Sequence, residues 1–487
     1  MYHKEKRIMN RINDHFYYVG ATILSAGIHF LYSVFVKAHI EPLEYGIYST
    51  CLLLSTYMTY IQLGSLNAFN RDYPQLIGAG NHKKAEEYRN TTFTFLLFIF
   101  TLTTVLISVF LLATGGGREQ KYTVGFVLSS VITTVTVLEN FLASRVRIDG
   151  DFRFTSFVIV AELLAVGAGF FLVPRIGYYS LFYVTMLSML IGIGMYYKRG
   201  IADLHLSIDG LLLRSIIISG IPLLINNLIW TTVNSIDKFV ILGFINTKAL
   251  GLYSIAQMAF SYIILVPSAM SQLFYVKLGK VYGATESKHS LNTTAMKYMM
   301  ILAVIVSFIV ICAYFLMEIV VAWMMPKYEG GVKAAQILML GLAIYSPTMV
   351  SSNILTILKK NAALLRGSVY LCVLNTICSV GLVVLRGATI ENVAIGTAVS
   401  YLIRTVILIY QLKKNAESNV IHMLKASVFP ILFTVGPGVL IYHVINHRII
   451  GFVLAVIIAG AIMGTVYRKD IINVVNVNCN NKLNIDS

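Results

Sequence analysis

The sequence predicts an all-α polytopic membrane protein with about fourteen transmembrane helices. Only 12% of the 487 residues are charged, whereas soluble domains carry about a quarter. Long uncharged runs, such as residues 92–113, can cross about 30 Å of hydrocarbon as helices. These runs lack the alternating apolar and polar residues of an outer-membrane barrel, so transmembrane strands are not expected.

Each apolar run begins and ends at charged residues, glycines or prolines. The first run follows a polar, basic segment and has no small-residue cleavage site, which predicts a retained first helix and not a removed signal peptide. Pro222, Pro267 and Pro347 lie inside later runs and predict bends. The expected helices span residues 15–37, 46–66, 92–113, 122–142, 153–173, 177–197, 215–243, 251–274, 297–322, 333–358, 365–385, 390–411, 424–443 and 449–467.

The basic residues predict how the chain is oriented. An even number of helices places both termini on one side. With the N-terminus inside, 27 of the 38 Lys and Arg residues fall in inner segments, so the positive-inside rule predicts that both termini are cytoplasmic. The net charge of +16 then reflects topology and attraction to anionic lipids, and no nucleic-acid partner is expected.

Motifs for enzyme chemistry are not found in the sequence. The five cysteines include no C-x-x-C pair, and His443 and His447, four residues apart, have no third ligand beside them, so no metal site is predicted. The chain has no G-x-x-x-x-G-K-[ST] phosphate loop. The connecting segments are too short to build a large catalytic domain. We therefore expect no catalytic residues and no cofactor beyond a coupling H+ or Na+.

A short turn sequence occurs twice, 205 residues apart: Gly46-Ile-Tyr-Ser49 follows the first run, and Gly251-Leu-Tyr-Ser254 follows the seventh. This repeat aligns helix 1 with helix 7 and helix 2 with helix 8. It predicts two six-helix lobes related by a pseudo-two-fold axis along the membrane normal, plus two C-terminal helices. The expected domains are residues 1–200, 201–415 and 416–487.

Four stretches resemble the polysaccharide flippases of the Wzx type, within the multidrug/oligosaccharidyl-lipid/polysaccharide exporter superfamily. They are EPLEYGIYS at 41–49, QLGSLNAFNRDYPQLIGAGNHKKAEE at 62–87, SGIPLLINNLIWTTVNSIDKFVILGFINTKALGLYSIA at 219–256 and MPKYEGGVKAAQILML at 325–340. The resemblance implies a flippase that moves undecaprenyl-diphosphate-linked oligosaccharide units across the bacterial cytoplasmic membrane by alternating access. Such units serve surface polysaccharides of the O-antigen kind. A polysaccharide polymerase and a chain-length regulator are candidate partners, besides membrane lipids.

Two alternative functions stay open. A cation-coupled drug exporter of the same superfamily predicts about twelve helices and an acid-dominated cavity. A glycan polymerase would require a long outer loop with clustered Arg or His. The helix number and the cations described next favour the flippase.

The candidate substrate-binding residues follow from the charge of a diphosphate head. Fixed cations attract such an anion strongly in a low-dielectric cavity, and polar helix faces can bind sugars. The candidates are Arg71, Arg145, Lys238 and Arg404, with His29, Asn227 and Asn234 on polar stripes of helices 1 and 7. Arg71 and Arg145 also fit ordinary positive-inside residues, and polar stripes also join helices through hydrogen bonds.

Two acids are candidate ion-coupling residues. Glu162 and Asp237 lie within apolar runs, where an ionisable group is costly and usually faces a protein interior or water. A carboxyl group in such a place can exchange a proton or a sodium ion. Asp237 precedes Lys238, so a local structural ion pair is the alternative.

Overall fold

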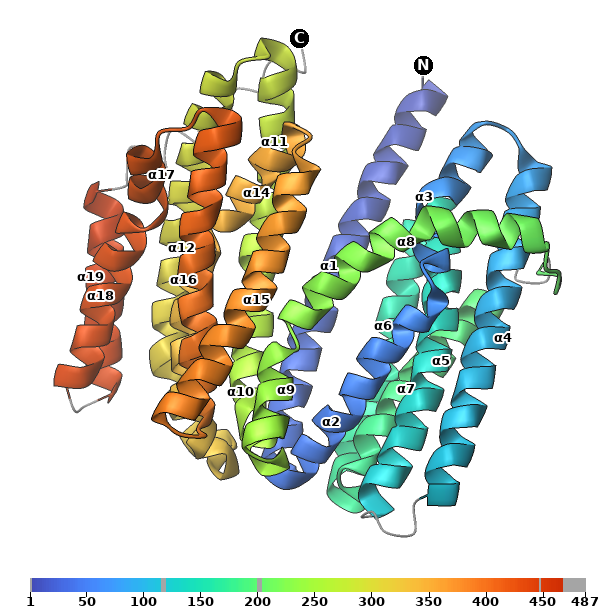
Figure 1. The fold of residues 1–487 in the computed structure, drawn as a ribbon, viewed down its shortest axis with the longest axis horizontal. Coiled ribbons are helices and arrows are strands. Elements are labelled where there is room, and N and C mark those ends of the chain that lie inside the picture. Colours follow the sequence, from blue (N-terminus) through green and yellow to red (C-terminus); the bar gives the residue numbers. More distant parts are fainter. Residues whose placement is uncertain (1, 115–119, 199–203, 446–447, 467–487) are drawn as a thin grey trace. The chain divides into compact units, whose positions relative to one another are not determined.

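A computed structural model describes residues 2–114, 120–198, 204–445 and 448–466, and every regular element in those ranges is a helix (Figure 1). Twelve described helical segments are long and apolar enough to cross a membrane. The predicted helices 46–66 and 449–467 have counterparts in α2 and α19. The all-α membrane class is therefore confirmed. The tail 467–487, expected to be cytoplasmic, lies outside the described residues.

The chain divides into two compact units, Met1–Thr231 and Thr232–Ser487. The first unit contains α1 (Tyr2–His39), α2 (Pro42–Met58), the 3-10 helix η1 (Thr59–Gln62), α3 (Ser65–Gly78), α4 (His82–Thr114), α5 (Gln120–Ile148), α6 (Phe152–Ile176), α7 (Tyr179–Lys198) and nearly all of α8 (Gly210–Val233). The domain boundaries expected at residues 200 and 415 stay predictions.

The second unit contains the remaining helices. They are α9 (Ile236–Phe244), α10 (Thr247–Ile263), α11 (Leu265–Thr285), α12 (Lys288–Met324), the 3-10 helix η4 (Pro326–Gly331), α13 (Val332–Tyr345), α14 (Thr348–Ile357), α15 (Asn361–Arg386), α16 (Ile390–Ala416), α17 (Val420–Ser427), α18 (Phe429–Val444) and α19 (Arg448–Val466).

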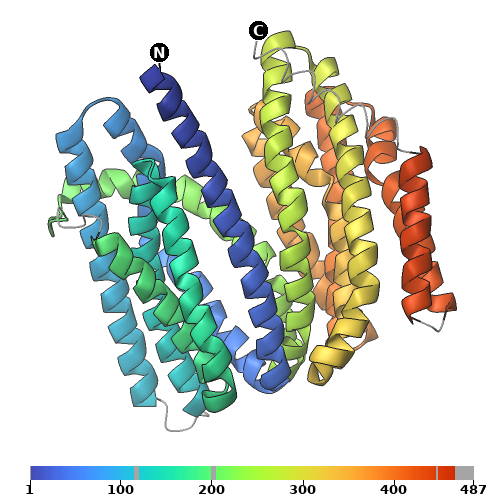
Figure 2. The ribbon, with the colours of Figure 1, turned by 180° about the vertical axis from the view of Figure 1, so that it is seen from behind.

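Aromatic packing joins the helices of the first unit. Phe69 of α3 stacks on Tyr73 with ring centroids 4.6 Å apart and contacts Phe141 of α5 at 4.7 Å. All three side chains are buried. Along a different side of the unit, α1 packs lengthwise on α6 (Figure 2). These contacts fix the helices that carry Arg71, Arg145 and Glu162.

The long helix α12 organises the second unit. Its neighbours include α11, α13, α14 and the last three helices, α17 to α19. Glycines allow close approach of the last two helices: a Cβ added at Gly438 of α18 would lie 3.2 Å from Ile311, and one at Gly451 of α19 would lie 3.1 Å from Phe315. The two extra C-terminal helices therefore pack against α12.

The repeated turn occupies the same register in both units. Both α2 and α10 have 17 residues, and they start and end at positions 205 apart. Gly46 and Gly251 are each the fifth residue of their helix, and both are buried. Ser49 and Ser254 are also buried at equivalent positions. The structure thus repeats a whole helix, with matching buried positions, around the short sequence match.

Several predicted runs are broken into two helices. Between η1 and α3, Leu63 and Gly64 adopt positive φ angles of 50° and 82°, a conformation that glycine adopts without penalty. Pro347 directly precedes α14, and Pro267 is the third residue of α11, so both mark breaks, as predicted. Pro222 lies inside α8. The α8–α9 break falls at Asn234 and Ser235 instead.

Candidate functional site

Asp237 lies at the centre of a buried polar cluster in the second unit. It is 9% exposed, and its Oδ2 accepts a hydrogen bond of 2.5 Å from the Tyr253 hydroxyl. The Thr397 hydroxyl lies 2.7 Å from Asp237 Oδ1 and 3.1 Å from Asn375 Oδ1. Ser379 donates to the same Asn375 oxygen at 3.1 Å. Four helices, α9, α10, α15 and α16, therefore supply this cluster.

Local structure places each member of the cluster. Asp237 stands in the first turn of α9, where the helix dipole favours a negative charge. The side chain of Asn246 caps α10 by accepting from the Ala249 N–H at 2.8 Å. Gly396 lets α16 approach α15, since a Cβ there would lie 2.5 Å from the Cα of Ser379. The close approach brings the hydroxyl and amide groups of both helices to the carboxylate.

One hydroxyl of the cluster, that of Thr397, has more acceptor oxygens nearby than it has protons to donate. Thr397 Oγ1 lies within 3.2 Å of Asp237, Asn375 and the Val393 carbonyl, yet a hydroxyl has one proton. The amide nitrogen of Asn375 has no protein partner. A buried carboxylate surrounded by hydroxyl and amide groups can hold a hard cation or a proton. Among the described residues, no three His, Cys, Asp or Glu side chains come together, so the donors are mainly neutral oxygens.

The first unit has no carboxylate at the equivalent place. The repeat offset pairs Tyr253 with Tyr48, whose ring contacts Phe182 at 5.0 Å. It pairs Asp237 with Tyr32, whose buried hydroxyl has no hydrogen-bond partner and packs on Gly169. The two repeats therefore conserve a tyrosine in the turn and differ in the group that faces it.

Arg404 is a buried cation in the second unit. It is 5% exposed, and its Nη1 has no hydrogen-bond partner. The guanidinium packs on Gly367 of α15, where an added Cβ would lie 2.6 Å from Cζ. Of the other second-unit candidates, Lys238 is half-buried and Asn234 is exposed. Arg404 follows Thr397 by seven residues, or about 10 Å along α16, so cation and cluster lie on one helix.

Arg71 belongs to a charged group in the middle of α3. Its Nε and Nη2 donate to the two oxygens of Asp72 at 2.6 and 2.9 Å, and the side chain is 44% exposed. Asp72 also accepts from Tyr88 of α4 at 3.1 Å and from Ser219 of α8 at 3.5 Å. The hydrogen bonds from the Arg71 guanidinium hold the pKa of Asp72 below its ordinary value. Arg71 thus faces solvent with part of its charge balanced.

Glu162 meets a second acid in the first unit. Its side chain lies beside that of Glu139 of α5. Both carboxyls lie over Gly192 of α7, where an added Cβ would lie 2.7 Å from Glu162 and 2.8 Å from Glu139. Two ionised carboxylates that lie this close repel each other, so the pair suits a bound proton or cation. Glu139 is half-buried within the helix bundle.

The remaining first-unit candidates are His29, Arg145 and Asn227, which lie on three different helices. His29 is exposed on α1. Two tyrosines of the same helix pack on α6: Tyr18 contacts Phe152, and Tyr32 contacts Phe170. Arg145 is half-buried near the end of α5. Asn227 is exposed on α8, and its amide donates to Asn67 of α3 at 3.4 Å.

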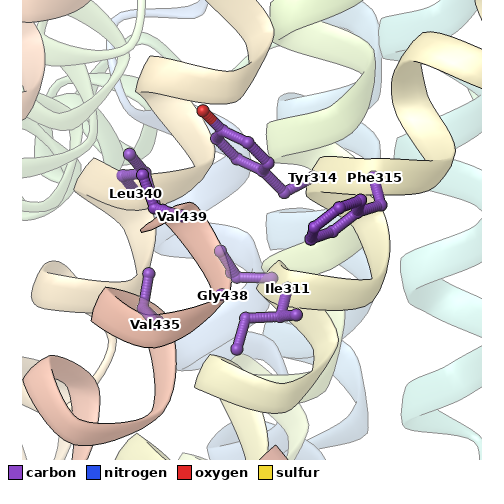
Figure 3. Close-up of a pocket in the computed structure, with 8 residues that line it drawn as sticks. Ile311, Tyr314, Phe315, Leu340, Val435, Gly438 and Val439 are labelled. Carbon is purple, nitrogen blue, oxygen red and sulfur yellow. The ribbon is translucent and has the colours of Figure 1, made fainter. Parts of the chain in front are cut away.

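A small pocket between α12, α13 and α18 is lined by apolar and aromatic side chains, including Tyr314, Phe315 and Val435 (Figure 3). No charged residue lines it. Nearby, the Tyr442 hydroxyl of α18 donates to Glu318 of α12 at 2.5 Å. The pocket therefore belongs to the packing of α18 on α12 and does not resemble an anion-binding site.

Sequence reasoning missed several members of these sites. Asn375, Ser379 and Thr397 lie well over a hundred residues along the chain from Asp237, and no local pattern links them to it. Tyr253 had a signal, since it is the tyrosine of the repeated turn. Aligning the two repeats marks Tyr253 as the equivalent of Tyr48, and this equivalence was the available signal for its role.

The comparisons with known proteins fit this fold. Residues 40–281 match the family described as polysaccharide biosynthesis protein. No curated protein matches the chain. A solved structure of the lipid II flippase MurJ, in an inward closed conformation, is similar with a TM-score of 0.70 at 14% identity, covering 93% of this chain and 99% of that chain.

Other similar structures are transporters of the MOP superfamily. A multidrug resistance MATE family transporter in an inward-facing conformation has a TM-score of 0.68 at 14% identity, covering 80% of this chain and 94% of that one. A transporter from Pyrococcus furiosus has a TM-score of 0.55 at 15% identity, with coverages of 82% and 94%. The polysaccharide biosynthesis match over residues 40–281 agrees with the resemblance to Wzx-type flippases, and the solved structures show that the chain has the multi-pass fold of these transporters.

Proposed function

We propose that this chain is a flippase that moves undecaprenyl-diphosphate-linked oligosaccharide units across a bacterial cytoplasmic membrane by alternating access. The observation that carries the proposal is the polysaccharide biosynthesis match over residues 40–281, on a fold similar to that of a lipid II flippase. The positive-inside count supports cytoplasmic termini. A polysaccharide polymerase and a chain-length regulator are its proposed partners.

Buried cations support an anionic substrate. Arg404 is only 5% exposed, yet its Nη1 has no hydrogen-bond partner. A buried donor without a partner destabilises the folded state by about 1–3 kcal/mol, and by more when the group is charged. A phosphate oxygen would satisfy that donor. We assign Arg404 and Lys238 to capture of the diphosphate in the second unit, and Arg71 in the first. His29, Asn227 and Asn234 are proposed to contact sugars.

The direct test of the substrate locates the glycolipid in cells. Deleting the gene is expected to trap the lipid-linked unit in the cytoplasmic leaflet. Replacing Arg404 with methionine should give the same accumulation in a protein that still folds, because well-packed apolar residues replace buried charges without loss of stability. Normal delivery of unlinked units to the outer side would instead indicate a polymerase.

We further propose that the Asp237 cluster binds the coupling ion and that it is sodium. Its oxygens come from a carboxylate, an amide and hydroxyls, which suit a hard cation. The Glu139–Glu162 pair is the proposed proton site, because two carboxyls that both lie against Gly192 repel each other when both are ionised. Both acids identified from sequence as ion-coupling candidates thus gain partners that the chemistry needs.

Sodium binding is tested on the purified protein. A ligand that binds only the folded state raises stability as its concentration exceeds Kd, so sodium chloride should raise the melting temperature above that in choline chloride. Asp237→Asn is expected to abolish the difference. Glu329→Gln, at an exposed acid of the same unit, serves as the matched control and should keep it. A sodium effect that survives in Asp237→Asn would refute the site.

The proton site has a separate test. Glu162→Gln and Glu139→Gln are each expected to weaken transport driven by a pH gradient across proteoliposomes. Transport that stays unchanged in both variants over a range of imposed gradients would contradict the assignment. Loss of gradient dependence in Asp237→Asn alone would place all coupling at the second-unit cluster.

A cation-coupled drug exporter is the second candidate. The similarity to a MATE family transporter and the buried acids in both units favour it. It predicts binding of cationic drugs and no accumulation of glycolipid on deletion. Measuring drug susceptibility and glycolipid location in the same deletion strain separates the two candidates.

A further inference from the structure

An apolar cavity of about 360 Å³ lies within the first unit, between α4, α5, α7 and the segment 204–209. Four of its lining residues are Phe93, Leu138, Leu142 and Ile193; Tyr197, Leu204 and Leu206 complete it. No charged residue lines the cavity. An apolar cavity has no partners to offer to water, whereas a bilayer supplies hydrocarbon chains to fill it.

The segment 204–209 is held over the cavity by α4. The N–H groups of Ser207 and Asp209 donate to the Thr94 and Thr91 hydroxyls at 3.1 and 3.5 Å. The segment alternates apolar and polar residues, and Leu206 is 68% exposed. Apolar surface continues past the cavity at Leu211, which is 82% exposed. Contiguous exposed apolar surface of this kind marks contact with a membrane or a partner.

Cations stand one helical turn from the cavity. Arg89 precedes Phe93 by four residues on α4, and Arg145 follows Leu142 by three residues on α5, so each pair shares a helix face. Asp149, in the turn after α5, interacts electrostatically with both arginines. Burial raises the pKa of this carboxyl, while the two guanidinium groups oppose that shift. The arginines therefore lie in one neighbourhood at this end of the unit.

We propose that the cavity holds a hydrocarbon chain of an anionic phospholipid, whose phosphate lies near Arg89 and Arg145. The apolar lining accounts for the chain. The two arginines, which have Asp149 and, 3.8 Å from Arg89, Glu86 beside them, supply N–H donors for the phosphate oxygens. The lipid belongs to the cytoplasmic leaflet if the positive-inside orientation holds. The inference does not depend on the transported substrate, and it assigns Arg145 to a resident lipid instead of the transported one.

Native mass spectrometry of the full-length protein tests the proposal. Phosphatidylglycerol is expected to bind roughly tenfold more tightly than phosphatidylcholine, since charge-assisted hydrogen bonds favour the anion. Filling the cavity with Leu138→Trp should lower phosphatidylglycerol binding by about the same factor. Leu106→Trp, at an exposed position of α4, is the matched control and should bind like the unmodified protein. Ile193→Phe is a smaller filling variant if Leu138→Trp fails to fold.

A third variant separates the headgroup from the chain. Arg89→Gln is expected to remove the preference for phosphatidylglycerol while leaving weak binding of both lipids. Equal binding of the two phospholipids to the unmodified protein, or full binding in both filling variants, would overturn the proposal. Displacement of phosphatidylglycerol by an equal concentration of a polyprenyl phosphate would assign the cavity to the lipid carrier and would also overturn it.

Discussion

Replacing Gly220 with alanine is expected to open the crossing of α8 over the break between α2 and α3. Figure 1 shows α8 crossing α2 and α3, and at this crossing Gly220 and Gly64 pack backbone against backbone. A Cβ on Gly220 would lie 2.6 Å from the carbonyl carbon of Gly64, and closer still to its oxygen. The Tyr60 hydroxyl lies 2.5 Å from Thr231 Oγ1 further along the same crossing.

The magnitude follows from these contacts. Ordinary contact begins near 3.4 Å, so the two backbones must separate by almost 1 Å or more. Overpacking of this kind costs about 1–3 kcal/mol, and alanine recovers roughly 0.5–1 kcal/mol of helix propensity relative to glycine. A weakened hydrogen bond at Tyr60 adds about 1 kcal/mol. We expect a net destabilisation of about 1–3 kcal/mol.

Two measurements check the prediction. Thermal unfolding in detergent compares Gly220→Ala with Gly194→Ala, a control on α7 where no atom lies within 4 Å of an added Cβ. Disulfide formation between Asn67→Cys and Asn227→Cys, in a background without the native cysteines, reports the separation at the crossing. An unchanged melting temperature together with an unchanged disulfide rate would refute the reasoning.

Three further substitutions test the sites described above. Tyr253→Phe removes a buried hydrogen bond to a carboxylate and should cost about 1–3 kcal/mol; a melting temperature equal to that of the unmodified protein would contradict this. Gly367→Ala places a Cβ against the buried guanidinium and should impair glycolipid transport, whereas Gly381→Ala, with no atom within 4 Å, should not; equal transport would sink the assignment. Asp72→Asn should lower the melting temperature at pH 7 but not below the lowered pKa of this carboxyl. The ion pair stabilises the folded state fully at pH values above 3.8, the ordinary pKa of the carboxyl, and this stabilisation is lost as the pH falls through the lowered pKa. A change in melting temperature that does not depend on pH would rule out the ion pair as its cause.

The structure also shows what the repeated turn does. In the first unit, the Lys37 ammonium lies 4.3 Å from the centre of the Tyr45 ring and donates to Ser33. In the second unit, Tyr253 donates to Asp237. Tyr45, which directly precedes the repeated Gly46-Ile-Tyr-Ser49, and Tyr253 each contact an ionisable group within their own helix bundle. The turn therefore places aromatic side chains against buried charge in each unit.

The sequence by itself determined the class of this protein, the order of its helices and the register of its repeat. Apolar runs longer than the bilayer must satisfy their backbone groups internally, so composition alone requires helices. A repeated turn fixes equivalent positions along the chain. Local patterns therefore sufficed to predict that α2 and α10 are equivalent helices. They also singled out Asp237 and Glu162 as acids whose insertion into a membrane is unfavourable and which therefore indicate a functional site.

Only the tertiary structure decided which groups meet those acids. Asn375 and Thr397 lie well over a hundred residues from Asp237, and Glu139 lies on a different helix from Glu162. Neither pairing follows from periodicity, because helical spacing specifies a face of one helix and not the helix that packs against it. Inter-helix packing, set by glycines such as Gly396 and Gly192, is what turns isolated polar residues into sites.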